Sequence, residues 1–447
     1  MIVTRFPPSP TGHAHIGSYR TAIFNYLFSK QNKGKFLLRI EDTDKARSKQ
    51  EYQDGIIESI KWLGLEYDGF SIQTENMPAH KAAMQKLVDE GKAYISKEEA
   101  KDGSGAIKEI VRFKNPNKPV TFKDLILGEV TDNTTDLGDF VIGRNIEDPL
   151  YHLAVVVDDM NSEVTHVIRG VDHISNTTRQ ILLIEALGGR VPTYAHIPMV
   201  LGDDKQKLSK RKGALSVLEY KKRGYLPAAI LNAATFMGFN PGGEKEIYTL
   251  DELIEVFDIT KVQKGGAVFN QVKLDWFNTE HMKLLSEAEY LNQAKAFIPE
   301  EIKSKILDTV VDKILLANRD RISYFGQLTD VFADTYMYET PAVDTSLLIV
   351  PEKMRKEKMV TIESTKIILT DLLGLLERAG DADFTSIETV KNIVWEYAET
   401  QGRGIVLWPL RIALTGKEKS IDPFSMMWIL NRDEVVKRLK NAIATLV

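Results

Sequence analysis

The chain has no cysteine in its 447 residues. Disulfide bonds, thiolate zinc ligands and cysteine nucleophiles are therefore excluded, which fits a reducing compartment. No apolar run approaches the roughly 20 residues of a membrane-spanning helix. The N-terminal residues also lack the basic start and apolar core of a signal peptide. From these absences we expect a cytoplasmic protein that makes no use of a membrane.

The composition is that of a globular protein with more than one hydrophobic core. Hydrophobic residues make up 43% and charged residues 27% of the chain, with a formal net charge of −5. A chain of this length favours two to four domains. The negative net charge argues against a protein that coats nucleic acids without selectivity, but local clusters of Lys and Arg can still bind RNA. Such clusters occur at 205–212, 221–223 and 353–358, although a solvated surface is the more ordinary interpretation of the last one.

The N-terminal segment has the pattern of strands alternating with helices. Short apolar runs at Val3–Phe6 and Phe36–Ile40 predict buried strands. Helical spacing of apolar residues begins near Gly17 and again over Tyr52–Leu63. This order predicts a parallel sheet, whose ligands bind beyond the carboxyl ends of the strands.

The sheet is expected to resume after an insertion. Apolar runs at Leu153–Val157 and Val164–Ile168 predict two further strands, and Gln180–Leu187 predicts a helix. Between Gly91 and Asp148 the sequence has Gly- and Pro-containing turns and short alternating runs. We expect a small inserted α+β domain there.

The segment Ser9–Ser18 is a turn that opens a helix. Gly12 and Gly17 allow close backbone approach to a ligand, and the helix start offers free N–H groups to an anion. His13 and His15 add donors for phosphate oxygens. A capped helix with two surface histidines would look the same in isolation. The pattern is neither a dinucleotide-binding glycine fingerprint nor a Walker loop.

A cationic loop, Lys207–Arg211, follows the sheet about 190 residues later. It could be an ordinary solvated turn. Its position after an α/β sheet favours another interpretation, in which Lys207 and Lys210 close over a triphosphate and follow its charge. A carboxylate attacking the α-phosphorus of ATP needs positioning and charge stabilisation, and no nucleophilic side chain.

In this order, the two motifs resemble the signatures of class I aminoacyl-tRNA synthetases, and nearly the whole chain is similar to bacterial-type glutamyl-tRNA synthetases. The segments that carry this resemblance are Thr4–Gly12, Leu38–Asp44, Trp62–Leu65, Tyr151–Asp159, Thr165–Gly170, Gly224–Pro227, Lys273–Trp276 and Pro409–Gly416. The resemblance implies an α/β fold. It comprises a Rossmann-like parallel sheet with an inserted α+β acceptor-binding domain, followed by an α-helical anticodon-binding region.

The family's activity is ATP-dependent ligation of L-glutamate to tRNA-Glu through a glutamyl-adenylate, with transfer to the 2′-hydroxyl of the terminal adenosine. The implied parts are catalytic halves at 1–91 and 151–202, an acceptor-end domain at 92–150, a lysine loop and stem-contact domain at 203–300, and an anticodon-binding domain at 301–447. Helical patterns such as Ile367–Leu376 and Val390–Ala398 agree with the last of these.

Residues matching the family's glutamate site are Arg5, Ser9, Glu41, Tyr151 and Arg169. Glutamate has two carboxylates and one ammonium, so two arginines and one acid suit it. Arg5 and Arg169 would each hold a carboxylate, in an order left open. Glu41 would pair with the ammonium, and Tyr151 would donate to the side-chain carboxylate. Without the resemblance, the two arginines could equally be structural ion-pair partners.

The implied ATP contacts are Gly12, His13, His15, Gly17, Ser18, Asp172, Lys207, Ser209 and Lys210. Of these, His15, Lys207 and Lys210 are expected to act in catalysis. We expect Mg²⁺ to be held largely by the ATP phosphates, with no protein metal site. Many relatives carry a cysteine-rich zinc site where this chain has Ala93–Lys97, so no zinc is expected. The partners implied are ATP, L-glutamate and tRNA-Glu, for a chain acting as a monomer.

Several alternatives share parts of this pattern. A non-discriminating enzyme would also glutamylate tRNA-Gln, and a glutaminyl enzyme has the same fold. A truncated tRNA-modifying paralogue or a small nucleotidyltransferase would lack the long helical C-terminal half. A non-catalytic tRNA-binding paralogue would be expected to have lost residues such as His15, Lys207 and Lys210, all of which are present.

Overall fold

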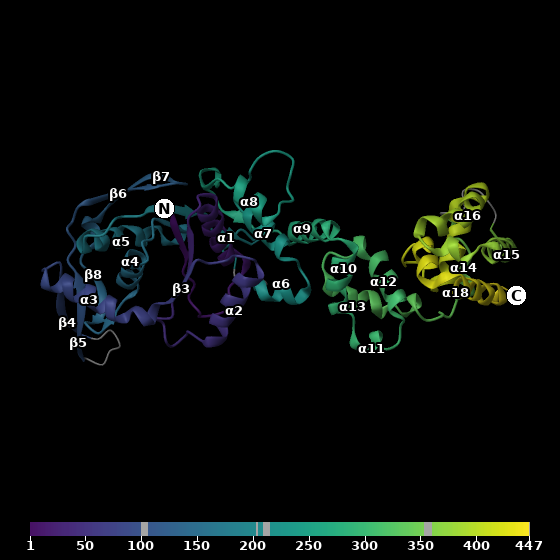
Figure 1. Ribbon diagram of the computed structural model, residues 1–447, viewed down its shortest axis with the longest axis horizontal. Coiled ribbons are helices and arrows are strands. Elements are labelled where there is room, and N and C mark those ends of the chain that lie inside the picture. Colours follow the sequence, from purple (N-terminus) through teal and green to yellow (C-terminus); the bar gives the residue numbers. More distant parts are fainter. Residues whose placement is uncertain (100–105, 203, 209–214, 353–359, 447) are drawn as a thin grey trace. The chain divides into compact units, whose positions relative to one another are not determined.

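The computed structural model describes residues 1–99, 106–202, 204–208, 215–352 and 360–446. Ser209 and Lys210, two of the expected ATP contacts, lie outside these ranges. The chain divides into two compact units, Met1–His281 and Met282–Val447 (Figure 1). Among the described helices, none combines the length and apolarity that a membrane span requires.

The first unit is built on a parallel sheet flanked by helices. Its strands are β1 (Val3–Phe6), β2 (Lys35–Ile40), β3 (Gly69–Ile72), β10 (His166–Gly170) and β11 (Thr193–Ile197). Its helices are α1 (Ile16–Gln31), α2 (Gln50–Trp62), α3 (Met77–Asp89), α4 (Tyr151–Asn161) and α5 (Ile174–Leu187). Parallel pairs join β1 to β2, β2 to β3, and β10 to β11. The N–H of Thr165 donates to the carbonyl of Val3 over 3.0 Å and brings β10 alongside β1.

The two N-terminal strands form where the apolar runs predicted them. β1 is buried along its whole length, and Phe36, Leu38 and Ile40 of β2 have no measurable exposure. Burial on both faces is the property that makes parallel strands continuous apolar runs. The predicted parallel sheet is confirmed.

The prediction of a strand at Leu153–Val157 is wrong, because these residues lie inside helix α4. All five are buried, as are the next two residues, Asp158 and Asp159. A helix buried on all sides has no polar stripe, so its sequence cannot be told from that of a buried strand by periodicity. The second apolar run does form a strand, β10, shifted by two residues.

The described part of the insertion contains two groups of strands and a short 3-10 helix, Thr134–Leu137. The strands are β4 (Ala93–Glu99), β5 (Ile107–Phe113), β6 (Pro119–Asp124), β7 (Gly128–Asn133), β8 (Phe140–Asn145) and β9 (Asp148–Pro149). β4, β5, β8 and β9 form one antiparallel sheet. The β6–β7 hairpin instead extends the main sheet, because Asp124 at the end of β6 pairs with Tyr194 of β11. The inserted segment therefore reaches the edge of the parallel sheet.

The rest of the first unit lies on either side of the lysine loop in the sequence, with β12 before it and the other elements after it. It contains β12 (Val200–Leu201), α6 (Val217–Arg223), α7 (Pro227–Phe236), α8 (Leu250–Val256), β13 (Ala267–Val268) and α9 (Gln271–Leu284), which runs into the second unit. β12 and β13 are parallel partners. Helix α7 packs on α1, and the guanidinium of Arg20 on α1 donates to the carbonyls of Met237 and Pro198. These contacts fix the start of α1.

The second unit has only helices among its described α and β elements (Figure 1). They are α10 (Glu287–Ala294), α11 (Glu300–Lys303), α12 (Asp308–Ala317), α13 (Leu328–Ala333), α14 (Thr345–Leu348), α15 (Ile362–Arg378), α16 (Ile387–Gln401), α17 (Arg403–Thr415) and α18 (Pro423–Thr445). The last four pack on one another around a core that includes Leu372, Val394 and Leu439. The predicted helical C-terminal region is confirmed.

Candidate functional site

A cavity of about 540 Å³ lies at the carboxyl edge of the parallel sheet. It is lined by every described residue that the sequence analysis assigned to a ligand: Arg5, Ser9, Gly12, His13, His15, Gly17, Ser18, Glu41, Tyr151, Arg169, Asp172 and Lys207. These residues come from the ends of β1, β2 and β10, the start of α1, the start of α4 and the beginning of the lysine loop. Their roles stay predictions, but their convergence on one cavity is an observation.

The start of α1 presents its first turn to this cavity. His15 occupies the N-cap position, and its side chain makes no capping hydrogen bond within the helix. Gly17 has a packing reason: a Cβ atom there would lie 3.0 Å from Cε1 and Nδ1 of the His15 ring and 3.3 Å from Cβ of Val200. The missing side chain therefore leaves room for the imidazole. The backbone of His15 also bridges to Ser216, beyond the lysine loop.

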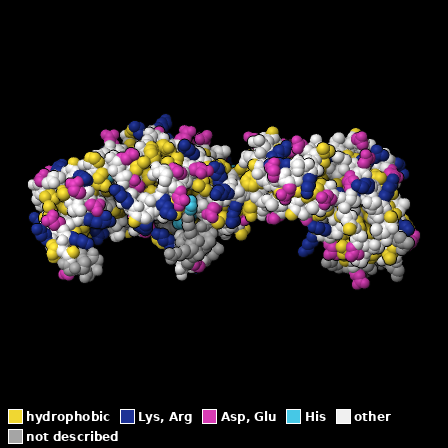
Figure 2. Space-filling view, turned by 90° about the horizontal axis from the view of Figure 1, so that it is seen from below, with side chains coloured by type: hydrophobic (Ala, Val, Ile, Leu, Met, Phe, Trp, Pro, Cys, Tyr) yellow, Lys and Arg dark blue, Asp and Glu magenta, His cyan; other side chains and the backbone are white. Residues whose placement is uncertain are grey.

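Backbone hydrogen bonds join the loops around the cavity. The N–H of Glu41 donates to the carbonyl of Pro8 over 3.0 Å, and the N–H of Lys49 donates to Pro10, also over 3.0 Å. The loops after β1 and β2 are thus held together, so Arg5 and Glu41 face the same cavity. On the described surface, Figure 2 shows a group of histidine atoms beside Lys and Arg side chains on the first unit.

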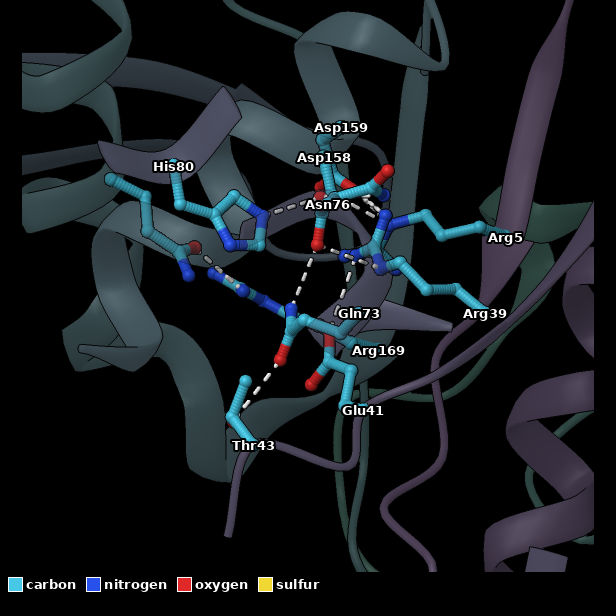
Figure 3. A network of polar contacts seen from close by, with 11 residues as sticks. Arg5, Arg39, Glu41, Thr43, Gln73, Asn76, His80, Asp158, Asp159 and Arg169 are labelled. Carbon is cyan, nitrogen blue, oxygen red and sulfur yellow. Dashed lines mark hydrogen bonds and ion pairs between the residues drawn. The ribbon is translucent and has the colours of Figure 1, made fainter. Parts of the chain in front are cut away.

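Arg5 and Arg39 converge on Asp159 of α4 (Figure 3). The Nε of Arg5 lies 3.1 Å from Oδ1 of Asp159, and Nη1 of Arg39 lies 2.8 Å from the same oxygen. Arg39 also contacts Glu41, with Nη2 3.2 Å from Oε1. Both guanidiniums are 2% exposed. Arg39 and Asp159 therefore link Arg5 and Glu41, two side chains that are expected to bind glutamate.

This network shifts the protonation of its carboxylates in different directions. Burial raises the pKa of Glu41, and the charges of Arg39 and Arg5 only partly oppose it. Burial would also raise the pKa of Asp159, but Arg5 and Arg39 outweigh it and hold that pKa below its usual range. Asp159 is consequently a fixed counterion. Glu41 is the carboxylate whose charged form an incoming ammonium would stabilise.

A second buried carboxylate, Asp158, lies next to this network and contacts Arg39. His80 Nε2 lies 2.7 Å from Oδ1, Gln73 Nε2 donates to Oδ2 over 2.8 Å, and Asn76 Nδ2 donates to Oδ1 over 3.1 Å (Figure 3). Arg39 Nε is 3.7 Å from Oδ2. Since Asp158 is fully buried, these partners offset the cost of its desolvation.

Arg169 has a different environment from Arg5, because its hydrogen-bond partners among the described residues are neutral groups. Nη1 donates to Oε1 of Gln180 and Nη2 to Oγ1 of Thr177, each over 2.7 Å, while Nε lies 3.3 Å from Nε2 of His196. Within the described part of the chain it makes no ion pair with a carboxylate. Burial lowers the pKa of Arg169. A buried cation that lacks a counterion among the described residues can pair with an anionic ligand.

Asp172 and Lys207 meet at the mouth of the cavity. Nζ of Lys207 lies 2.7 Å from Oδ2 of Asp172, and both side chains are well exposed. Burial would raise the pKa of Asp172, but the hydrogen bond from Lys207 and the nearby His173 bring it below its usual range. Gly170 makes the contact possible, because a Cβ there would lie 2.4 Å from Oδ1 of Asp172.

Several supporting residues of the site have no role in the sequence analysis, among them Arg39, Asp159, Asp124 and His196. One signal was available, since a charged residue such as Arg39 inside a buried strand needs a buried partner. Asp124 and His196 are brought together by the pairing of β6 with β11, and no local pattern predicts that contact.

The arrangement offers two buried guanidiniums, one carboxylate and a helix start with adjacent histidine and lysine side chains. Two guanidiniums and a carboxylate match a dicarboxylate with an ammonium, and the helix start matches a phosphate group. Comparison of the sequence with known protein families is consistent with this chemistry. Residues 1–102 and 95–276 match the catalytic domain of tRNA synthetases class I (E and Q), and residues 281–443 match an anticodon binding domain.

Full-length relatives give the same result. A glutamate–tRNA ligase of Thermodesulfovibrio yellowstonii is 37% identical over 99% of both chains. The enzyme of that name from Aquifex aeolicus is 36% identical over 100% of this chain and 99% of its own. The crystal structure of a glutamate tRNA ligase from Elizabethkingia meningosepticum, in complex with its amino acid, superposes with a TM-score of 0.85 at 28% identity over the whole of both chains. This chain belongs to the class I tRNA synthetases of the E and Q type.

Proposed function

We propose that this chain is a glutamate–tRNA ligase. In the first step, a carboxylate oxygen of L-glutamate attacks the α-phosphorus of ATP, and pyrophosphate leaves as the glutamyl-adenylate forms. In the second step, the 2′-oxygen of the terminal adenosine of tRNA-Glu attacks the glutamyl carbonyl. AMP then leaves, and the hydroxyl proton is released.

The observation that carries this proposal is the unequal environment of the two buried arginines. Arg169 has only neutral partners, and Nη1 of Arg5 has no hydrogen-bond partner among the described residues. Each arginine can therefore accept a carboxylate without breaking an existing ion pair. Glu41, whose pKa is raised by burial, gains a counterion when the ammonium of glutamate binds. Tyr151 and Ser9 line the same cavity and supply hydroxyl groups.

The ATP phosphates are assigned to the start of α1 and the lysine loop. Gly12, His13, Gly17 and Ser18 would contact ATP through the helix start, with His15, Lys207 and Lys210 stabilising the charge that moves to pyrophosphate. Asp172 and Ser209 complete the proposed set. Mg²⁺ would neutralise phosphate charge. The described residues contain no group of three or more His, Asp or Glu suited to a cation, so phosphate and water oxygens are its proposed ligands.

The remaining parts of the chain are proposed to bind the tRNA. The chain is proposed to act as a monomer. Residues 92–150 would bind the acceptor end, 203–300 the inner stem, and the helices from 301 onward the anticodon. The boundaries of these five parts stay predictions. Two acceptor ranges fit this proposal, namely tRNA-Glu alone or tRNA-Glu together with tRNA-Gln, and charging both transcripts separates them.

Amino-acid-dependent exchange between pyrophosphate and ATP tests the proposal, with and without tRNA-Glu. Glutamate should support exchange, and glutamine should do so at least about a hundredfold less well, because it leaves one arginine without a carboxylate. Aspartate serves as the control for length. Equal exchange with glutamine and glutamate, or none with any amino acid in either condition, would contradict the assignment.

A further inference from the structure

We propose that His196 is a positioning residue for Arg169, and that Asp124 of the inserted segment holds the His196 ring in the tautomer this requires. The inference deepens the proposed function, on which it rests. It makes the inserted β6–β7 hairpin part of the support of the amino-acid pocket.

The contacts form one directed chain of hydrogen bonds. Nη2 of Arg169 donates to Oγ1 of Thr177 over 2.7 Å. That hydroxyl lies 3.0 Å from Nε2 of His196, and Nδ1 of His196 lies 2.7 Å from Oδ2 of Asp124. Since Asp124 accepts the proton of Nδ1, Nε2 has a lone pair to accept from Thr177 and from Nε of Arg169. Every donor in this series points away from Arg169 toward Asp124.

Asp124 is anchored on both of its carboxylate oxygens. Oδ1 accepts from the N–H groups of Ile126 and Leu127, over 2.9 and 2.8 Å, in the turn of the hairpin. Oδ2 accepts from the backbone N–H of His196 over 3.0 Å as well as from its ring. The carboxylate is 2% exposed. One side chain therefore joins the hairpin turn to the strand that carries His196.

The surroundings keep His196 neutral. Burial lowers its pKa, and the neighbouring charge of Arg169 acts in the same direction against the opposing effect of Asp124. A protonated ring would direct an N–H from Nε2 at Nε of Arg169, which can only donate. Tyr194 lies beside the imidazole, with ring centroids 5.9 Å apart and planes 8° from parallel.

Some N–H groups of Arg169 donate to the protein, and the others are proposed to donate to the ligand. A guanidinium has five N–H groups. In Arg169, the N–H of Nε is directed at His196, one N–H of Nη1 at Gln180 and one N–H of Nη2 at Thr177. Among the described contacts, this leaves one N–H on Nη1 and one on Nη2. Two N–H groups on two nitrogens are what a carboxylate takes in a bidentate pair. His196 and Thr177 thus fix the plane of the guanidinium and leave its ligand-binding donors available.

Steady-state aminoacylation of tRNA-Glu by variants of the full chain tests this inference. His196→Leu should raise the KM for glutamate about tenfold or more, since a buried charge loses a partner, while the KM for ATP changes less than about twofold. His196→Gln keeps an acceptor near the position of Nε2 and should recover most of the difference. Asp124→Asn should raise the KM for glutamate in the same direction, because its amide can donate to Nδ1 and favour the other tautomer.

The chain offers a matched control, Asp132→Asn. Oδ2 of Asp132 accepts from Thr178 over 2.8 Å, so it also joins the hairpin to α5, but it contacts neither His196 nor Arg169. Its KM for glutamate should equal that of the wild type. An unchanged KM for glutamate in His196→Leu, or equal rises in both KM values, would overturn the positioning role.

Two further outcomes separate a folding defect from a failure of the proposed function. If circular dichroism shows that His196→Leu does not fold, the role is tested with His196→Gln and Asp124→Asn. An unchanged KM for glutamate in both variants then overturns the positioning role of His196. A wild-type chain that does not charge tRNA-Glu at all contradicts the proposed function instead. The two failures are therefore distinguishable.

Discussion

Nε of Arg5 lies 3.1 Å from Oδ1 and 3.2 Å from Oδ2 of Asp159, so a single nitrogen of this guanidinium contacts both carboxylate oxygens. Nη1 of Arg5, in contrast, has no hydrogen-bond partner among the described residues. Asp159 simultaneously pairs with Arg39. One carboxylate therefore orients the arginine at the floor of the cavity and neutralises part of its charge.

Asp159→Asn should destabilise the first unit by about 3–5 kcal/mol, because it leaves two guanidiniums buried without their shared counterion. The free energy of unfolding of that unit, from urea titration, measures the effect. Glu58→Gln is the matched control, since Glu58 pairs with Lys221 at 2.7 Å on the surface. The control should lose no more than about 1 kcal/mol. Equal losses in the two variants would remove Asp159 from this role.

Gly17→Ala should lower kcat/KM for ATP by about ten- to a hundredfold, because its methyl group would displace the ring of His15 from the start of α1. Initial rates at varied ATP concentration measure this. Gly374→Ala, in the interior of α15 with nothing within 4 Å, is the control for an added methyl group. It should keep wild-type rates and slightly raise stability. Wild-type kinetics in Gly17→Ala would mean that the position of His15 does not matter.

Lys210→Ala should slow adenylate formation by about a hundredfold or more while leaving the KM for glutamate nearly unchanged, because a donor that stabilises moving charge is lost. Lys207→Ala should act in the same direction. Rapid-quench measurement of pyrophosphate release reports the step itself. Lys221→Ala removes a surface lysine from the same unit and serves as the control. A rate equal to that of the control would place these lysines away from the phosphates.

His152 should make the first unit less stable in mild acid. Burial, assisted by the charges of Arg179 and Arg169, lowers the pKa of His152 from 6.5 to about 4. Between these values the unfolded chain binds a proton that the folded chain does not, so stability is full above about pH 6.5 and falls toward pH 4. The thermal midpoint should therefore drop less between pH 7 and pH 5 in His152→Gln than in the wild type. Equal drops would contradict the shift.

The parallel sheet could be predicted because its information is local. Runs such as Val3–Phe6 and Phe36–Ile40 end at turn signals, and the rule that ligands bind at the carboxyl edge then places Arg5 and Glu41 together. The prediction failed at Leu153–Val157, where a fully buried helix has the same composition as a buried strand. Local pattern cannot separate the two when every residue is apolar.

The supporting residues of the site could not be predicted in the same way. Asp124 contacts His196 only because β6 of the insertion pairs with β11, and Asp159 reaches Arg39 only because α4 packs beside the sheet. These contacts join residues that are 72 and 120 positions apart. Family resemblance indicated residues that line the cavity, but the residues that contact them from behind are set by tertiary packing.

Charging of a tRNA-Glu transcript with radiolabelled glutamate and ATP tests the central claim most directly. We expect acid-precipitable glutamyl-tRNA with the wild-type chain, and a loss of about a hundredfold or more in kcat/KM for glutamate in Arg169→Gln, which lacks the charge for one carboxylate. A parallel tRNA-Gln transcript defines the acceptor range. No charging of either transcript, under conditions in which a control synthetase is active, would contradict the assignment of this chain as a glutamate–tRNA ligase.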